Sequence, residues 1–147
     1  MPERARAILS SVTEAARCFK PDGRWSAKEN IGHLDDLSGV DEKRLNDYLS
    51  NASSLSPADT RNPATEAANH NSRSWIEIIE RLKENRLHFT HQLAQLTNEQ
   101  LQRKALHLRL QQQMRLLDWL WFIAEHDDHH LAAASTAIAA HERNLSR

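Results

Sequence analysis

The sequence predicts an all-α protein that folds as a four-helix bundle. Three glycines and four prolines in 147 residues leave few positions that interrupt a helix, and helix-favouring residues such as alanine, leucine and glutamine are abundant. Four long segments also repeat apolar residues at helical spacing, and four such helices pack most economically as a bundle. The length fits a single domain over residues 1–147, and the loop lengths permit more than one order of helix connection.

The first predicted helix covers residues 3–19 and places apolar side chains from Ala5 to Phe19 on one face. Pro21-Asp22-Gly23 follows it and has the composition of a turn. The second predicted helix, residues 26–49, begins with the capping-box pair Ser26 and Glu29.

Two glycines, Gly32 and Gly39, lie two turns apart on this second helix. Each costs about 1 kcal/mol of helix propensity relative to alanine. Close approach of a neighbouring helix is one reason for a sequence to tolerate that cost.

The third predicted helix, residues 64–96, follows a loop at 51–63 that is rich in serine, proline and asparagine. Its apolar residues recur close to heptad spacing. A short helix at 97–105, capped by Thr97 and Gln100, and an irregular stretch around His107 come next.

The fourth predicted helix begins near residues 111–114 and ends near His141. Its centre is apolar nearly all round, because Trp121 and Phe122 lie off the main apolar stripe. A helix of this kind is either central in the fold or packed against a second subunit, so we expect a homodimer with these two residues on the outer face.

The most informative feature is the phase of two histidines on this helix. His126 and His130 continue the apolar stripe that runs through Trp119 and Ile123, so both imidazoles should point into the protein. Residues four apart on a helix lie about 6 Å apart along its axis, so both rings can bind one ion. Buried histidines need partners, and a divalent ion of zinc, nickel, cobalt or iron suits both. The competing interpretation is a pair of core histidines bonded to backbone or carboxylate groups.

A catalytic metal site usually has three protein ligands and one open position. His33 is the best candidate for the third ligand, because it shares the core-facing stripe of the second predicted helix. His129 should lie at the edge of the site or in solvent, and it is a candidate for a second-shell contact rather than the favoured ligand. Glu29 and Asp36, one turn before and about one turn after His33, could each supply a carboxylate ligand or a second-shell hydrogen bond, although helix capping is the favoured role for Glu29. The histidines without such pairing are expected on the surface: His70, His88, His91, His107 and His141.

The segments Trp25-Ser-Ala-Lys-Glu-Asn-Ile-Gly-His33 and Phe122-Ile-Ala-Glu-His126-Asp-Asp-His-His130 together resemble the two signatures of the DinB-like superfamily. The resemblance implies a DinB/YfiT-like bundle and one divalent metal held by His33, His126 and His130. Relatives of known activity are metal-dependent transferases and isomerases that use low-molecular-weight thiols such as bacillithiol or mycothiol, and others are assigned only as metal-dependent hydrolases. The chain departs from the family where Ala133 and Ala134 replace a glutamine and an aliphatic residue, which changes the surroundings of the site.

Charge and cysteine content restrict the other functions. The net charge of −1 offers nothing to attract nucleic acid or an anionic membrane. The single cysteine, Cys18, cannot form an internal disulfide and is more typical of a small core residue than of a nucleophile. With no apolar run of membrane-spanning length and a polar N-terminus, we expect a cytoplasmic protein.

Two hypotheses follow from these patterns. In the first, the protein is a mononuclear metal enzyme, a thiol-dependent S-transferase or a hydrolase, in which the metal activates a thiol or a water against a small-molecule substrate. Glu29, Asp36 or Asp127 could then orient a ligand imidazole or carry a proton. In the second, the bundle is a non-catalytic dimerisation module with a vestigial site.

Overall fold

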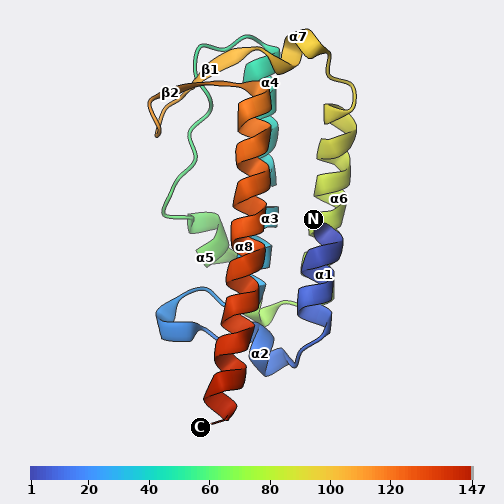
Figure 1. Ribbon diagram of the computed structural model, residues 1–147, viewed down its shortest axis with the longest axis vertical. Helices are drawn as coiled ribbons and strands as arrows, with labels where there is room; N and C mark the ends of the chain where they lie inside the picture. Colours follow the sequence, from blue (N-terminus) through green and yellow to red (C-terminus); the bar gives the residue numbers. More distant parts are fainter. Residues whose placement is uncertain (147) are drawn as a thin grey trace.

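The computed structural model describes residues 1–146 and confirms a mostly helical four-helix bundle (Figure 1). The long helix α8 runs the length of the molecule and packs on α3, which also contacts α6, while α1 packs against α6 and α8. The helices and strands are α1 (Pro2–Ser10), α2 (Glu14–Cys18), η1 (Pro21–Gly23), α3 (Ala27–Asp36), α4 (Ser38–Leu49), α5 (Pro63–Ala68), η2 (His70–Ser72), α6 (Trp75–Leu93), α7 (Asn98–Leu101), β1 (Lys104–His107), β2 (Gln112–Arg115) and α8 (Leu116–Leu145).

The first two predicted helices are each divided in the structure. The segment 3–19 breaks after α1, and the side chain of Thr13 accepts a hydrogen bond from the Ala16 amide to begin α2. The segment 26–49 is interrupted only at Leu37, whose backbone keeps right-handed helical angles (φ −79°, ψ −10°). The chain therefore stays helical through this break, and α4 continues the course of α3.

The third predicted helix is divided more strongly. Asn69 ends α5 in the left-handed conformation (φ 47°, ψ 52°), which asparagine tolerates better than most residues. His70 follows in η2, and the extended backbone of Arg73 precedes α6. The division brings α5 and η2 against α3.

A two-stranded hairpin is the main departure from the all-helical prediction. The helix expected to continue to residue 105 ends at Leu101, and β1 then pairs antiparallel with β2, matching Lys104 to Arg115. The turn contains neither glycine nor proline, and Gln111 supplies its positive φ of 50°. The hairpin also attaches to the 51–63 loop, because the Leu55 amide donates to the Leu106 carbonyl at 2.9 Å. The last helix consequently begins at 116 rather than at 111–114.

The core consists of two apolar clusters with a polar layer between them. One cluster lies among α1, α3, α6 and the C-terminal half of α8, and the other lies among α4, the hairpin, the end of α6 and the start of α8. On α8 the first cluster begins at Leu131 and the second ends at Ile123. The histidine segment lies between these two positions, so the middle of the bundle is polar.

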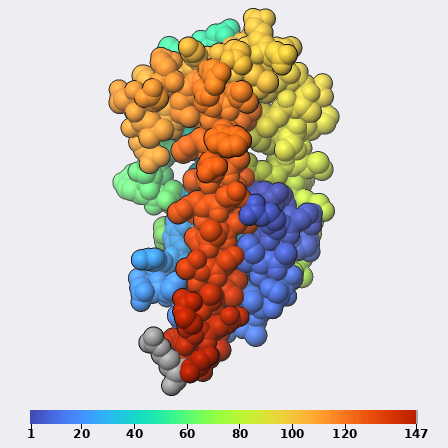
Figure 2. Space-filling model, in the orientation of Figure 1, coloured from blue at the N-terminus to red at the C-terminus, as the bar shows by residue number. Residues whose placement is uncertain are grey.

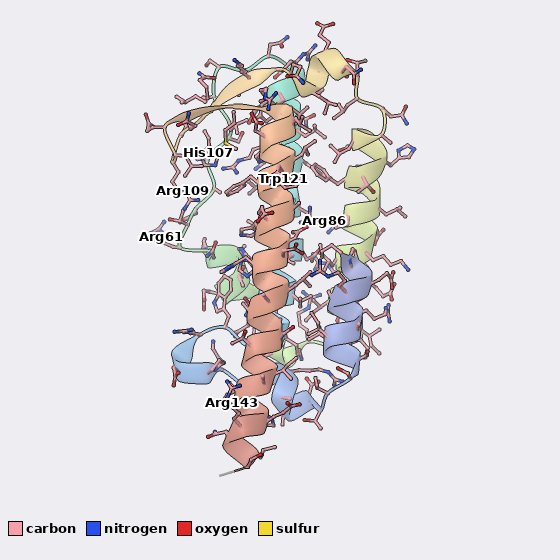
Figure 3. All side chains as sticks on the ribbon, in the orientation of Figure 1. Arg61, Arg86, His107, Arg109, Trp121 and Arg143 are labelled. Carbon is pink, nitrogen blue, oxygen red and sulfur yellow. The ribbon has the colours of Figure 1, made fainter. Side chains whose placement is uncertain are left out.

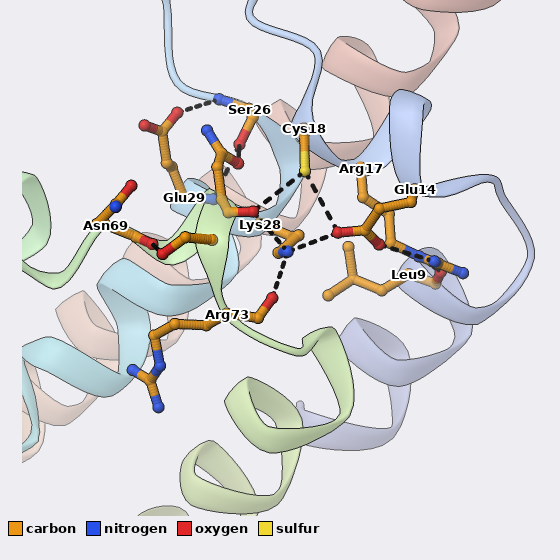
Figure 4. Close-up of polar contacts among 11 residues, drawn as sticks. Leu9, Glu14, Arg17, Cys18, Ser26, Lys28, Glu29, Asn69 and Arg73 are labelled. Carbon is orange, nitrogen blue, oxygen red and sulfur yellow. Dashed lines mark hydrogen bonds and ion pairs between the residues drawn. The ribbon is translucent and has the colours of Figure 1, made fainter.

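A fully buried lysine joins several segments at the end of the molecule opposite the hairpin (Figure 4). The Lys28 ammonium donates to the Glu14 carboxylate at 2.7 Å, to the Asn71 carbonyl at 3.0 Å and to the Arg73 carbonyl. These bonds account for all three of its donors, which makes the burial of the charge tolerable. The half-buried Cys18 thiol lies against the same Glu14 and Asn71 groups. This cluster joins α2, α3 and the segment before α6.

The outer face of α8 only partly matches the prediction. Trp121 is 71% exposed and Leu117 is 44% exposed. The helix that carries them, α8, crosses the front of the molecule (Figure 2). Phe122, expected on the same outer face, instead lines a cavity beside α8. The homodimer therefore stays a prediction. Within residues 1–146, no helix combines the length and the apolar character needed to cross a membrane.

Candidate metal centre

The structure brings together the three histidines singled out in the sequence. α3 supplies His33, and α8 supplies His126 and His130 one turn apart. One ring nitrogen from each lies within 4.8 Å of the other two. The ring centroids of His130 lie 4.6 Å from His33 and 4.5 Å from His126. The three side chains thus surround one point in the polar layer, where α3 crosses α8.

The tautomer of His130 follows from its bond to Asn30. The Asn30 amide nitrogen donates to the carbonyls of Trp25 and Ser26, at 3.2 and 2.9 Å, so its oxygen faces the other way. That oxygen lies 2.9 Å from Nδ1 of His130 and can only accept, so Nδ1 carries the proton. A neutral ring protonated at Nδ1 has its lone pair at Nε2, which is the nitrogen left for a metal.

The orientation of His33 is set by a chain of polar groups. Its Nδ1 lies 2.9 Å from the hydroxyl of Thr65, which α5 places against α3. The Asp36 carboxylate lies near both Thr65 and His33, and it accepts from Nε2 of His70 at 2.8 Å. Because Nδ1 of His33 is engaged by Thr65, Nε2 is the ring nitrogen left for a metal.

Burial keeps the three imidazoles neutral near pH 7. Loss of solvent, then the proximity of His126, lowers the pKa of His33 to about 4. Loss of solvent, then the proximity of the other two rings, lowers the pKa of His130 to about 3. Burial also lowers the pKa of His126. Only a neutral imidazole can bind a metal, so the site is ready for one without first losing protons.

Burial by itself would raise the pKa of Asp36, but the bond from His70 and the proximity of Thr65 outweigh it and hold that pKa below its ordinary value. The carboxylate is therefore charged at neutral pH. A charged acceptor strengthens the hydrogen bonds that end on it.

One side of the site is covered and the other is open. The Trp25 ring lies 4.8 Å from the His33 ring and 5.9 Å from the His130 ring, measured between centroids, and covers the first side. The other side opens into a cavity of about 330 Å³. This volume suits a small molecule. The apolar walls of the cavity come from Leu37 between α3 and α4, from α4, from the 51–63 loop and from α8. The residues are Leu37, Val40, Leu55, Phe122 and Ile123.

The other predicted candidates have different positions. Asp36 lies near His33 and Thr65, as described above. Glu29 is confirmed as a capping residue: its carboxylate accepts from the Ser26 amide and from Lys20, both at 2.8 Å, so it does not support the site. His129 is exposed at the rim of the cavity, with its ring edge-on to that of His130.

Asp127 does not orient a ligand imidazole. Its carboxylate accepts from Arg86 of α6 at 2.7 Å, and Asp41 lies 3.7 Å from the same guanidinium. The three groups form an ion-paired cluster that joins α4, α6 and α8 behind the histidines.

Two of the histidines expected on the surface are buried. His70 is fully enclosed against α3, and His107 is 2% exposed in the cavity wall, whereas His88 and His91 are exposed as expected. His70 fits because Gly32 has no side chain: a Cβ there would lie 2.4 Å from atoms of the His70 ring. The close approach predicted for the glycine pair is thus made at one of them, by a side chain rather than a helix. Gly39 has no atom within 4 Å of such a Cβ.

The donor set fits a divalent metal. Two imidazoles, those of His33 and His130, are anchored through Nδ1 by the neutral side chains of Thr65 and Asn30 and present Nε2, and the third comes from the preceding turn of α8. Anchoring through the second ring nitrogen is the usual arrangement of histidine ligands, and imidazole suits zinc, nickel, cobalt and iron. Three candidate ligands beside an open cavity match the pattern of a catalytic rather than a structural metal site. Fold and site together define a helical bundle in which three histidines converge on one point.

Comparison with known proteins gives the family. Residues 1–134 match the model of the DinB superfamily, and the chain belongs to this superfamily. The fold is similar to the solved structure of YfiT from Bacillus subtilis, with a TM-score of 0.79 at 20% sequence identity, over 99% of this chain and 81% of that one. YfiT is described as a probable metal-dependent hydrolase with an unusual four-helix bundle topology. No curated protein matches the chain.

Proposed function

We propose that the protein is a mononuclear metal-dependent enzyme that activates a nucleophile against a small molecule bound in the cavity. The observation that supports this most strongly is the convergence of His33, His126 and His130, with Nδ1 of His33 and of His130 engaged in hydrogen bonds and Nε2 of each left for the ion. A divalent ion held by these nitrogens would supply Lewis acidity, which lowers the pKa of a water or thiol that reaches it to near neutrality.

The residues around the histidines prepare the site for this chemistry. Asn30 and Thr65 fix two of the rings, so the ligand nitrogens do not have to be reoriented when the ion binds. Trp25 excludes solvent from one side, and the cavity leaves the other side accessible. Substrate and nucleophile must therefore both arrive from the cavity side.

The nucleophile is either water or a small thiol. The description of YfiT as a probable metal-dependent hydrolase supports water, and the motif resemblance to thiol-dependent transferases supports a thiol. The only cysteine, Cys18, lies in the Lys28 cluster with α2, outside the residues that line the cavity. Any thiol that reacts at the site must therefore come from outside the chain.

The experiment compares two reactions in one set of proteins. Wild type, His126→Ala and the exposed control His91→Ala are each loaded with zinc, nickel, cobalt or iron(II). They are then assayed for hydrolysis of activated esters and for transfer of a small thiol to a generic electrophile. We expect metal-dependent turnover in wild type and His91→Ala, and a loss of at least a hundredfold in His126→Ala.

Turnover that requires the thiol would define a transferase, and turnover with water alone would define a hydrolase. Bound metal with neither reaction in any of the four loaded forms would overturn the proposal and favour a non-catalytic bundle.

A further inference from the structure

The cavity contains basic groups that the metal site does not use. Arg44 and Arg86 on helices α4 and α6, together with Arg109 in the hairpin turn, line it, as do the carboxylates of Asp41 and Asp59. Arg86 is held by Asp127 at 2.7 Å and lies 3.7 Å from Asp41. The Asp59 carboxylate is bound by its own neighbour in the loop, Arg61, at 2.7 Å.

Arg44 is the buried cation of this group without an ion pair. The residue is 8% exposed, and its Nε donates to the Ser56 carbonyl at 2.9 Å. Among residues 1–146, no hydrogen-bond partner is found for its two Nη groups, and no carboxylate lies within 4 Å of it. A guanidinium held by Nε and open at both Nη positions presents two parallel donors, which match the two oxygens of an oxyanion.

His107 adds a neutral donor beside Arg44. Its Nδ1 accepts from the Leu110 amide at 3.3 Å, so the neutral ring carries its proton on Nε2. The ring is 2% exposed and lines the cavity. Arg44, His107 and Arg109 all line the same cavity.

Arg109 lies at the mouth of the cavity. Its side chain is exposed, and it makes no ion pair within the part of the chain that the structure describes. Figure 3 shows Arg109 near His107, on the side of α8 that faces the 51–63 loop. An exposed arginine of this kind guides an anion toward the buried one by long-range attraction.

Phe122 connects these basic groups to the histidines. Its ring lies 6.0 Å from the His107 ring and 6.4 Å from the His126 ring, measured between centroids. A molecule a few carbon atoms long can therefore reach from one set of groups to the other along an apolar wall.

We infer that the cavity binds a small organic oxyanion, a carboxylate or a phosphate ester, whose oxygens accept from Arg44 and His107, with Arg109 at the entrance. The anionic end lies beside the hairpin and the rest of the molecule extends past Phe122 toward the three histidines. That orientation rests on the proposed function, which places the reacting bond at the end of the molecule nearest the three histidines. The oxyanion site itself does not require the metal.

The test measures binding of three matched probes, benzoate, phenyl phosphate and neutral benzyl alcohol, by isothermal titration calorimetry. The proteins are wild type, Arg44→Gln, Arg109→Gln and the exposed control Arg143→Gln, which lies near the end of α8 (Figure 3). All are used as purified, at equal metal content. We expect at least one anion to bind wild type and Arg143→Gln at least tenfold more tightly than benzyl alcohol does.

Arg44→Gln should weaken that binding by about tenfold to a hundredfold, because a charge-assisted pair is lost. Arg109→Gln should weaken it severalfold. Since Arg109 is exposed and unpaired, that variant keeps the test valid even if Arg44→Gln does not fold. Preference for one of the two anions identifies the substrate class, and equal affinity assigns a general oxyanion site.

Anion binding that is unchanged in Arg44→Gln and Arg109→Gln would overturn the inference, because the anion would then be held elsewhere, for example by the metal. So would equal binding of all three probes. This failure is distinguishable from failure of the proposed function. If the oxyanion site were absent, metal-dependent turnover of neutral substrates could still be observed. If the proposed function were wrong, arginine-dependent anion binding could still be observed.

Discussion

Replacing Gly32 with alanine should destabilise the protein, whereas the same change at Gly39 should stabilise it. Both residues lie in helices, so alanine brings up to about 1 kcal/mol of helix propensity at each position. At Gly39 nothing lies within 4 Å of the added Cβ, and that gain is retained. At Gly32 the Cβ would lie 2.4 Å from three atoms of the His70 ring, so the ring must move.

The cost at Gly32 can be estimated from what holds His70. The ring is fully buried and bonded to Asp36, so it cannot swing into solvent. Overpacking a buried site costs about 1–3 kcal/mol, and weakening a bond to a charged acceptor costs a similar amount. After subtracting the helix gain, we expect a net loss of roughly 1–5 kcal/mol. For a chain of this size that is about 2–20 °C in melting temperature.

Urea unfolding followed by circular dichroism measures both variants against wild type. Because His70 also holds Asp36, which lies near Thr65 and His33, Gly32→Ala should bind zinc about 10–100-fold more weakly. Gly39→Ala should bind zinc as wild type does. If Gly32→Ala raised the free energy of unfolding as Gly39→Ala does, the close packing of His70 on α3 would be wrong.

Three further predictions concern the site. Chelation with EDTA should lower the melting temperature of the metal-loaded protein by about 5–11 °C, since an ion present at a hundredfold excess over its Kd adds about 2.7 kcal/mol to stability; an unchanged melting curve would place the ion outside the fold. In metal-free protein, the pKa values of His33, about 4, and His130, about 3, are depressed. On acidification, these histidines therefore bind protons in the unfolded chain at pH values where they stay neutral in the folded chain. Stability should therefore be fully present above pH 6.5 and fall below it, by about 1.4 kcal/mol per pH unit for each histidine; urea titrations that give a flat profile between pH 6.5 and 4 would contradict this. Thr65→Val, which removes the hydrogen-bond partner of His33 Nδ1 at nearly constant volume, should weaken zinc binding about 10–100-fold, and exposed Thr136→Val should not; equal affinities by competition with a chromophoric chelator would exclude the Thr65 link.

Much of the fold and the position of the three histidines could be predicted because helical periodicity is local information. His126 and His130 lie in phase with Trp119 and Ile123, and His33 lies in phase with Leu37, so the direction of each side chain followed from spacing alone. Family membership, predicted from the two motifs, is also confirmed.

The features that could not be predicted depend on contacts distant in sequence. The hairpin has no glycine or proline in its turn, and hydrogen bonds join its first strand to the 51–63 loop. His70 is buried because Gly32, on another helix, leaves room for it. Thr65 has no neighbouring pattern that marks it as a site residue. Asn30 did carry a signal, since it precedes His33 by three residues and so shares its helix face.

The most direct test of the central claim is the metal content of the purified chain after dialysis, measured by elemental analysis. We predict about one divalent ion per chain in wild type, the same content in the exposed double variant His88→Ala/His91→Ala, and none in His33→Ala/His126→Ala. Equal and substoichiometric metal in all three proteins would contradict the three-histidine centre.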